Sequence, residues 1–187
     1  METARTGHRF RVRALSIFFV LFASMAAMGL PEENPEARPS GRPVYWWFGA
    51  SLGAGFIFGG ETENLVLGGV NLTAQWGKIF VSLCGSAGVN PSDDRTSVGG
   101  GALMVGHFKR KERSAWSAGA GIGYVDMYPP SKPPFKGIAV PLEVRYSWFF
   151  SSSAALTVAG LVNFNGGASY AGLTVGIQLG RVRARGA

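Results

Sequence analysis

From residue 44 onward, large apolar residues alternate with small or polar ones in stretches of about ten residues, and this alternation constrains the fold more than any other feature. In the first stretch, 44–59, the even positions include Trp46, Leu52 and Phe56, whereas the odd positions are mostly Gly and Ser. Successive side chains of a β-strand point to opposite faces. A period of two therefore predicts a strand with one wholly apolar face.

The same alternation returns seven more times before residue 180, at near-even spacing. The weakest repeat is 98–108. Its predicted apolar face carries Val98 and Phe108, but its opposite face carries Leu103 beside His107. The eight predicted strands are 44–59, 66–76, 79–89, 98–108, 116–124, 138–148, 156–164 and 171–179.

Two barrel architectures use such strands, and the composition of the second face favours one of them. A soluble barrel exposes charged and polar side chains, yet only 16% of this chain is charged and the non-apolar faces are mostly Gly, Ser and Ala. Small side chains suit the interior of a narrow barrel, and an apolar outer face suits a bilayer. The sequence thus predicts an all-β fold, an eight-stranded antiparallel up-and-down transmembrane β-barrel, in which closure satisfies every backbone group.

The N-terminal region reads as a targeting segment rather than as part of the barrel. Four Arg precede an apolar run over 14–23, and small residues follow it, so residues 1–29 are predicted to be a secretory signal peptide. Cleavage is expected after Ala26 or Gly29, and an uncleaved anchor is the alternative. Residues 30–43 contain four prolines and read as a linker, which leaves 44–185 for the barrel.

The high net charge of +7 does not indicate a nucleic-acid partner. Removing residues 1–26 takes four Arg and one Glu from the 18 basic and 11 acidic residues, which leaves 14 and 10, a net +4. Half of the remaining basic residues cluster at 109–113 and at Arg181, Arg183 and Arg185, near the predicted periplasmic rim. There they favour membrane lipids as partners, and a solvated charged turn and tail is the alternative.

The predicted outward-facing aromatic residues fall at the two ends of the barrel. With both termini in the periplasm, the outward-facing tryptophans all lie at the periplasmic rim, and a second aromatic set lies at the opposite rim. Two aromatic belts around an aliphatic band are typical of membrane barrels. The tryptophan belt is Trp46, Trp76, Trp116 and Trp148, and the opposite set is Phe56, Phe58, Tyr124 and Phe164.

A few polar residues are predicted to face the barrel interior. Glu143 and Arg145 lie two apart on the inward face of 138–148, so we expect a buried ion pair completed by Asn71, Gln75 or Gln178. A catalytic acid at Glu143 is the less favoured interpretation. No residue pattern indicates a catalytic site, a cofactor site or a metal site.

The longest predicted external loop is 126–137, which carries four prolines. A proline-rich loop is stiff and extended, and this loop is the first candidate for binding a surface ligand.

With its signal peptide, its eight alternating strands over 44–180 and both aromatic belts, the chain resembles the small eight-stranded outer-membrane barrels of the OmpA/OmpX type. Such barrels commonly end on an aromatic residue, whereas this chain ends in the Arg-rich stretch 181–187. Pro141 lies inside a predicted strand of a closed barrel, so a bulge is expected there.

The sequence predicts an integral protein of the bacterial outer membrane with a structural, adhesive or surface-recognition role. No open pore is expected, because eight strands leave an interior that side chains fill. We expect no enzymatic activity. The alternatives are an envelope lipid-modifying enzyme that uses His107 and Glu143, and a secreted soluble barrel that binds a small hydrophobic ligand.

Overall fold

The computed structural model describes residues 44–59, 62–93, 96–128 and 133–181. The predicted signal peptide, the linker 30–43 and residues 182–187 lie outside the described residues, as does the side chain of Arg181. The strands are β1 (Val44–Phe58), β2 (Glu63–Trp76), β3 (Ile79–Val89), β4 (Ser97–Arg110), β5 (Ser114–Tyr128), β6 (Phe135–Phe149), β7 (Ala154–Asn165) and β8 (Ser169–Arg181).

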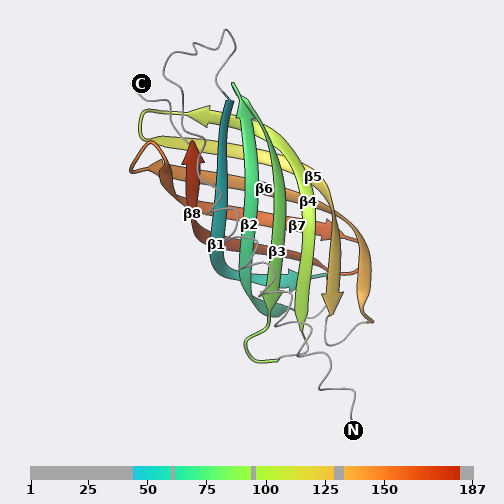
Figure 1. Cartoon of the computed structure of the whole chain (residues 1–187). Helices are drawn as coiled ribbons and strands as arrows, with labels where there is room; N and C mark the ends of the chain where they lie inside the picture. The colour runs from blue at the N-terminus through green and yellow to red at the C-terminus, as the bar shows by residue number, and fades with distance from the viewer. Residues whose placement is uncertain (1–43, 60–61, 94–95, 129–132, 182–187) are drawn as a thin grey trace. The chain divides into compact units, whose positions relative to one another are not determined.

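These strands form one closed barrel in which every neighbour is antiparallel. β1 pairs with β2 on one side and with β8 on the other, from Trp46 opposite Arg181 to Phe58 opposite Ser169. In Figure 1, strands β1 to β3 cross strands β6 and β7 at a steep angle, as strand tilt in a small barrel requires, while the end of β8 rises beside β1. The predicted all-β, eight-stranded, up-and-down architecture is confirmed.

The connections are short at one end of the barrel and longer at the other. The turns Gly77–Lys78, 111–113 and 150–153 lie at the end where β1 begins and β8 ends, which we call the turn end. The connections at the opposite, loop end are 59–62, 90–96, 129–134 and 166–168. The loop predicted at 126–137 is therefore shorter, because β5 continues to Tyr128 and β6 begins at Phe135. No helix among the described residues is long and apolar enough to cross a membrane.

The apolar face points outward on seven strands as predicted, and the assignment for β4 is wrong. Val98, Met104 and Phe108 are buried inside the barrel, whereas Leu103 and Val105 are more than half exposed on the outside. Both faces of β4 carry apolar residues, so a period of two cannot decide between them. Interior packing determines which face of β4 points inward, because Val98 and Phe108 each belong to a cluster of buried side chains.

The sheet bends most tightly at β1 and β5, where β2 comes close to β8 and β4 comes close to β6. Glycines face each other across the strand pairs at these bends. Gly55 pairs with Gly172 between β1 and β8, and Gly106 pairs with Gly119 between β4 and β5. A Cβ atom on Gly106 would lie 2.2 Å from the carbonyl oxygen of Ala118. Only glycine allows the backbones to approach this closely.

Gly106→Ala is expected to lower the free energy of unfolding by about 1–3 kcal/mol, because the backbone oxygen of Ala118 cannot move aside. Gly99→Ala on the same strand is the matched control, since an added Cβ there meets nothing within 4 Å. Urea unfolding of the reconstituted barrel measures both variants. Equal stability of the two variants would show that the close approach at this bend is not needed.

The bulge predicted at Pro141 is absent. β5 and β6 keep one register on both sides of the proline, from Ala120 opposite Leu142 to Gly123 opposite Ala139. The two intervening positions drop out of the ladder, because proline has no backbone N–H to donate. On its other side, Pro141 still lies opposite Asn163 of β7. The closed sheet therefore accommodates the proline by losing local pairing and not by inserting a residue.

Candidate functional site: the closed barrel interior

A buried ion pair lies inside the barrel on the inward face of β6. Arg145 Nη2 is 2.6 Å from Glu143 Oε1, and the two side chains are only 9% and 19% exposed. Two charges taken out of water need further hydrogen bonds as well as each other. The residues around Arg145 supply them.

The guanidinium of Arg145 donates to two amide side chains from other strands. Arg145 Nη1 donates to Asn71 Oδ1 at 3.3 Å. With the Gln178 amide oriented to satisfy its neighbours, the Gln178 oxygen accepts from Arg145 Nη1 at 2.8 Å and from Trp47 Nε1 at 2.7 Å. The Gln178 nitrogen then donates to Ser147 Oγ at 3.2 Å. The pair is thus tied to β1, β2 and β8.

From Asn71, hydroxyl and sulfur groups continue the polar contacts across β2, β3 and β4. Thr73 donates to Asn71 at 3.3 Å and shares a hydrogen bond of 2.7 Å with Ser82. Ser82 in turn contacts Cys84 at 3.3 Å, and Cys84 lies 3.7 Å from the sulfur of Met104. These contacts form a polar layer across the middle of the barrel.

The structure places four of the five residues expected in the interior network around one centre: Glu143, Arg145, Asn71 and Gln178. Gln75 instead donates to the carbonyl of Gly77 at 2.7 Å, toward the β2–β3 turn.

The sequence interpretation missed Trp47, Thr73, Ser82 and Ser147. Their inward parity was visible, but no pattern within one strand tells which residues of distant strands meet.

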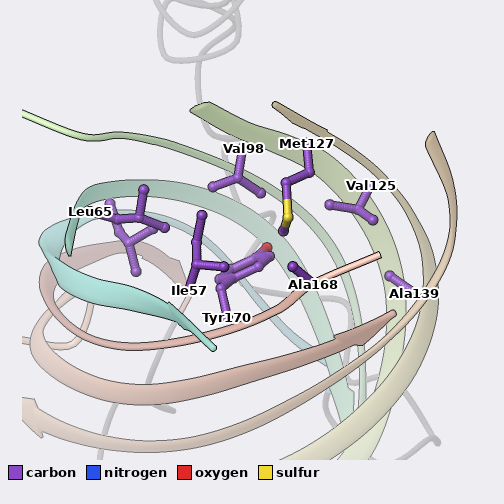
Figure 2. Packing of buried hydrophobic residues seen from close by; sticks show 9 residues of the cluster. Ile57, Leu65, Val98, Val125, Met127, Ala139, Ala168 and Tyr170 are labelled. Carbon is purple, nitrogen blue, oxygen red and sulfur yellow. The ribbon is translucent and has the colours of Figure 1, made fainter. Parts of the chain in front are cut away.

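Large apolar side chains close the barrel above and below the polar layer, and the sequence interpretation did not predict them. The loop-end cluster is shown in Figure 2, where its side chains point into the space that the strands enclose. Tyr170 links this cluster to the polar layer through Ser86 Oγ, 3.1 Å from its hydroxyl. The loop-end cluster is Ile57, Leu65, Leu67, Val98, Val125, Met127, Ala139, Ala168 and Tyr170.

The turn-end cluster is mainly aromatic. The rings of Trp47 and Phe108 lie 5.6 Å apart. The guanidinium of Arg110 lies 4.7 Å from the ring centre of Phe149 and 5.6 Å from that of Tyr45, where cation–π attraction holds it over the cluster. The turn-end cluster is Trp47, Phe80, Phe108, Ala115, Phe149 and Ala155.

A cavity of about 80 Å³ lies between the two clusters. Glu143, Arg145 and Asn71 line it together with Ser86 and the hydroxyl-bearing Tyr170. With these polar groups in its wall, a cavity of this size accommodates a few water molecules. It is far smaller than the sites of ~300 Å³ or more that take small organic ligands. Among the described residues, no group of three or more His, Cys, Asp or Glu could hold a metal ion.

His107 and Glu143 do not share a site. His107 is exposed on the outer face of β4, whereas Glu143 faces the interior. A general acid or base must come within hydrogen-bond reach of the same substrate as its catalytic partner. The barrel wall separates these two side chains, so they cannot act together on one lipid.

The outer face of the barrel is an uninterrupted apolar surface between its two rims. Leu52, Ile122 and Ile138 are 62–69% exposed there. All four residues of the predicted tryptophan belt lie outside, at the turn end, and the ring of Trp116 lies 4.9 Å from that of Tyr146. At the loop end, Phe58 lies 6.1 Å from Phe56 and 6.3 Å from Phe164. The outward-facing residues of the loop-end set are Phe56, Phe58, Tyr124 and Phe164.

Two solved membrane-barrel structures resemble this fold. Neisserial surface protein A (NspA) aligns with a TM-score of 0.60 and 9% sequence identity, over 73% of this chain and 96% of that one. Ail, the attachment invasion locus protein of Yersinia pestis, aligns with a TM-score of 0.54 and 6% identity, over 73% and 96% of the two chains. Together with the apolar outer face, these likenesses show that the fold is that of the small eight-stranded transmembrane β-barrels.

No protein-family profile matches the sequence, and no curated protein matches it.

Proposed function

We propose that the chain is an integral protein of a bacterial outer membrane whose closed barrel anchors a surface-recognition region and forms no pore. One observation carries this proposal: large apolar side chains cover the outside of a closed eight-stranded barrel, while two apolar clusters block its inside. Such a surface is stable only against hydrocarbon. Membrane lipids are then its immediate partners.

The closed interior supports a role without transport. A solute crossing the barrel would have to pass both clusters and the ion pair between them. Eight strands leave room for filling side chains and not for an aqueous channel. The barrel therefore serves as an anchor, and its function lies at its surfaces.

The β5–β6 connection is the best candidate for surface recognition, because its two ends are held firmly. Lys136 Nζ lies 3.0 Å from Asp126 Oδ2 and 5.8 Å from the ring centre of Tyr128, and these contacts join the end of β5 to the start of β6. Phe135 packs into the loop-end cluster and lies so close to Gly167 that a Cβ there would meet its ring at 2.4 Å. The names of the two similar barrels, a surface protein and an attachment protein, support a surface role.

The two alternative functions have less support. A soluble barrel that binds a hydrophobic ligand needs apolar side chains around a large interior cavity, whereas here the apolar faces point outward and the cavity is small and contains a charged pair. An envelope lipid-modifying enzyme needs its acid and base in one place, and the barrel wall separates His107 from Glu143.

An epitope tag inserted between Ser131 and Lys132 is expected to be recognised by antibody on intact Gram-negative cells. The same tag inserted between Ser151 and Ser152, in the β6–β7 turn, is the matched control and should be recognised only after permeabilisation. Short turns face the periplasm in barrels of this class, which gives the expected difference. Antibody labelling is read together with the membrane fraction that contains the protein. Labelling of the turn on intact cells would reverse the proposed orientation, and absence from the outer-membrane fraction would refute the proposed location.

A further inference from the structure

Three exposed basic residues lie near one another at the turn end: His107 and Lys109 on the outer face of β4, and Lys78 in the adjoining β2–β3 turn. The backbone N–H of Phe108 donates to the carbonyl of Lys78 at 2.7 Å, which places the β2–β3 turn directly beside β4. Phe108 points into the barrel, so its neighbours His107 and Lys109 point outward on either side of this contact. Lys78 is exposed as well.

Aromatic side chains of the tryptophan belt surround these three residues. Lys109 lies opposite Trp116 in the β4–β5 ladder, and the Trp116 ring contacts Tyr146. Lys78 follows Trp76 by two positions in the sequence. Tryptophan and tyrosine rings lie at the depth of the lipid headgroups. The three basic groups are therefore at the level of the phosphates.

A shallow apolar groove of about 320 Å³ runs over the outer face next to this cluster. Trp46 and Trp76 lie along it, with the smaller Ala74 and Val81 between them. Leu83 and other leucines continue the groove toward the middle of the barrel. The groove is lined by Trp46, Leu72, Thr73, Ala74, Trp76, Val81, Leu83 and Leu103.

The charges of the described residues differ between the two ends of the barrel. The β4–β5 turn adds Lys111 and Arg113 to the basic groups at the turn end, against Glu112. The acidic residues Glu63, Asp93 and Asp126 lie at the loop end, with Lys136 as the basic residue there. Among the described residues, the excess of basic groups is therefore at the turn end, which suits an anion there.

We propose that this surface binds an anionic phospholipid of the inner leaflet, with the lipid phosphate among Lys78, His107 and Lys109 and one acyl chain in the groove beside Trp76. An anionic lipid fits better than a zwitterionic one, because the headgroup amine of the latter would be repelled by the charged amines of Lys78 and Lys109. The inference rests on the proposed insertion and orientation of the barrel in the membrane.

Quenching of tryptophan fluorescence by brominated lipids tests the proposal. The full barrel is reconstituted in phosphatidylcholine containing either dibrominated phosphatidylglycerol or dibrominated phosphatidylcholine, and relative binding constants are obtained from the quenching. We expect phosphatidylglycerol to bind roughly threefold more strongly or better. The double variant K78Q/K109Q should reduce this preference to about onefold, and about 0.5 M NaCl should weaken it through screening. The variant K136Q, at the other rim, is the control and should keep the preference.

Equal binding constants for the two lipids in the inserted wild-type barrel would overturn the lipid site and leave the proposed function intact. Retention of the preference by K78Q/K109Q would also overturn it. Quenching that falls for both lipids as the protein-to-lipid ratio rises would show that a second copy of the chain covers the groove instead. Absence of quenching by either lipid would mean that the barrel does not insert, which refutes the proposed function itself.

Discussion

Arg145→Met is expected to lower the free energy of unfolding by about 3–5 kcal/mol. The substitution leaves the carboxylate of Glu143 inside the barrel without its partner at 2.6 Å. It also removes the donor that reaches Asn71 and the Gln178 oxygen. Unfolding in urea, followed by tryptophan fluorescence of the barrel in lipid vesicles, measures the loss.

The double variant E143L/R145M separates the cost of an unpaired charge from the worth of the pair. Replacing both partners by apolar residues removes the buried charge, and such replacements are often neutral or stabilising. We expect the double variant to recover most of the stability that Arg145→Met loses. If the single variant is as stable as the wild type, Glu143 is not held as a charge inside the barrel.

Leu83→Lys is expected to lower the free energy of unfolding in a bilayer by about 2–4 kcal/mol, because it places a charge on the lipid-facing surface near the middle of the membrane. Leu83 is 62% exposed and points outward from β3. The measurement is reversible unfolding of the vesicle-bound barrel in guanidinium, compared between variant and wild type.

Ile79→Lys is the matched control, since Ile79 lies on the same face of the same strand and is 55% exposed. It lies at the turn-end rim, beside Lys78, where a charge reaches the headgroups and costs about 0–1 kcal/mol. A barrel whose outer face met water would tolerate both lysines equally. Equal losses for the two variants would therefore contradict the membrane assignment.

The strands could be predicted from the sequence because each one carries its own signal. A period of two and a break at each turn are local properties, so seven of the eight face assignments hold without knowledge of neighbouring strands. The prediction of the outward face was wrong for β4, because Leu103 and Phe108 are both large and apolar but point to opposite sides of the strand. Sequence pattern alone does not reveal which of two apolar faces an interior cluster requires.

The sequence predicts which residues point into the barrel, but it does not predict which of them contact one another. The inward parity of Arg145 and Glu143 is visible in the sequence, and their pairing follows from their spacing. The hydrogen bonds of Gln178 to Trp47 and Ser147 join residues from β8, β1 and β6, which only the closed register brings together. The two apolar clusters are equally non-local, because no strand contributes more than two residues to either of them.

Closing the sheet and closing the barrel interior depend on the same two strands, β1 and β8. Ile57 of β1 and Tyr170 of β8 both belong to the loop-end cluster, and Trp47 of β1 donates to Gln178 of β8. The loop-end cluster and the contacts of Trp47 are therefore incomplete until β1 pairs with β8. A half-assembled barrel would thus be open both at its edge and along its axis, and the permeability barrier of the membrane would return in one step, when β1 and β8 pair.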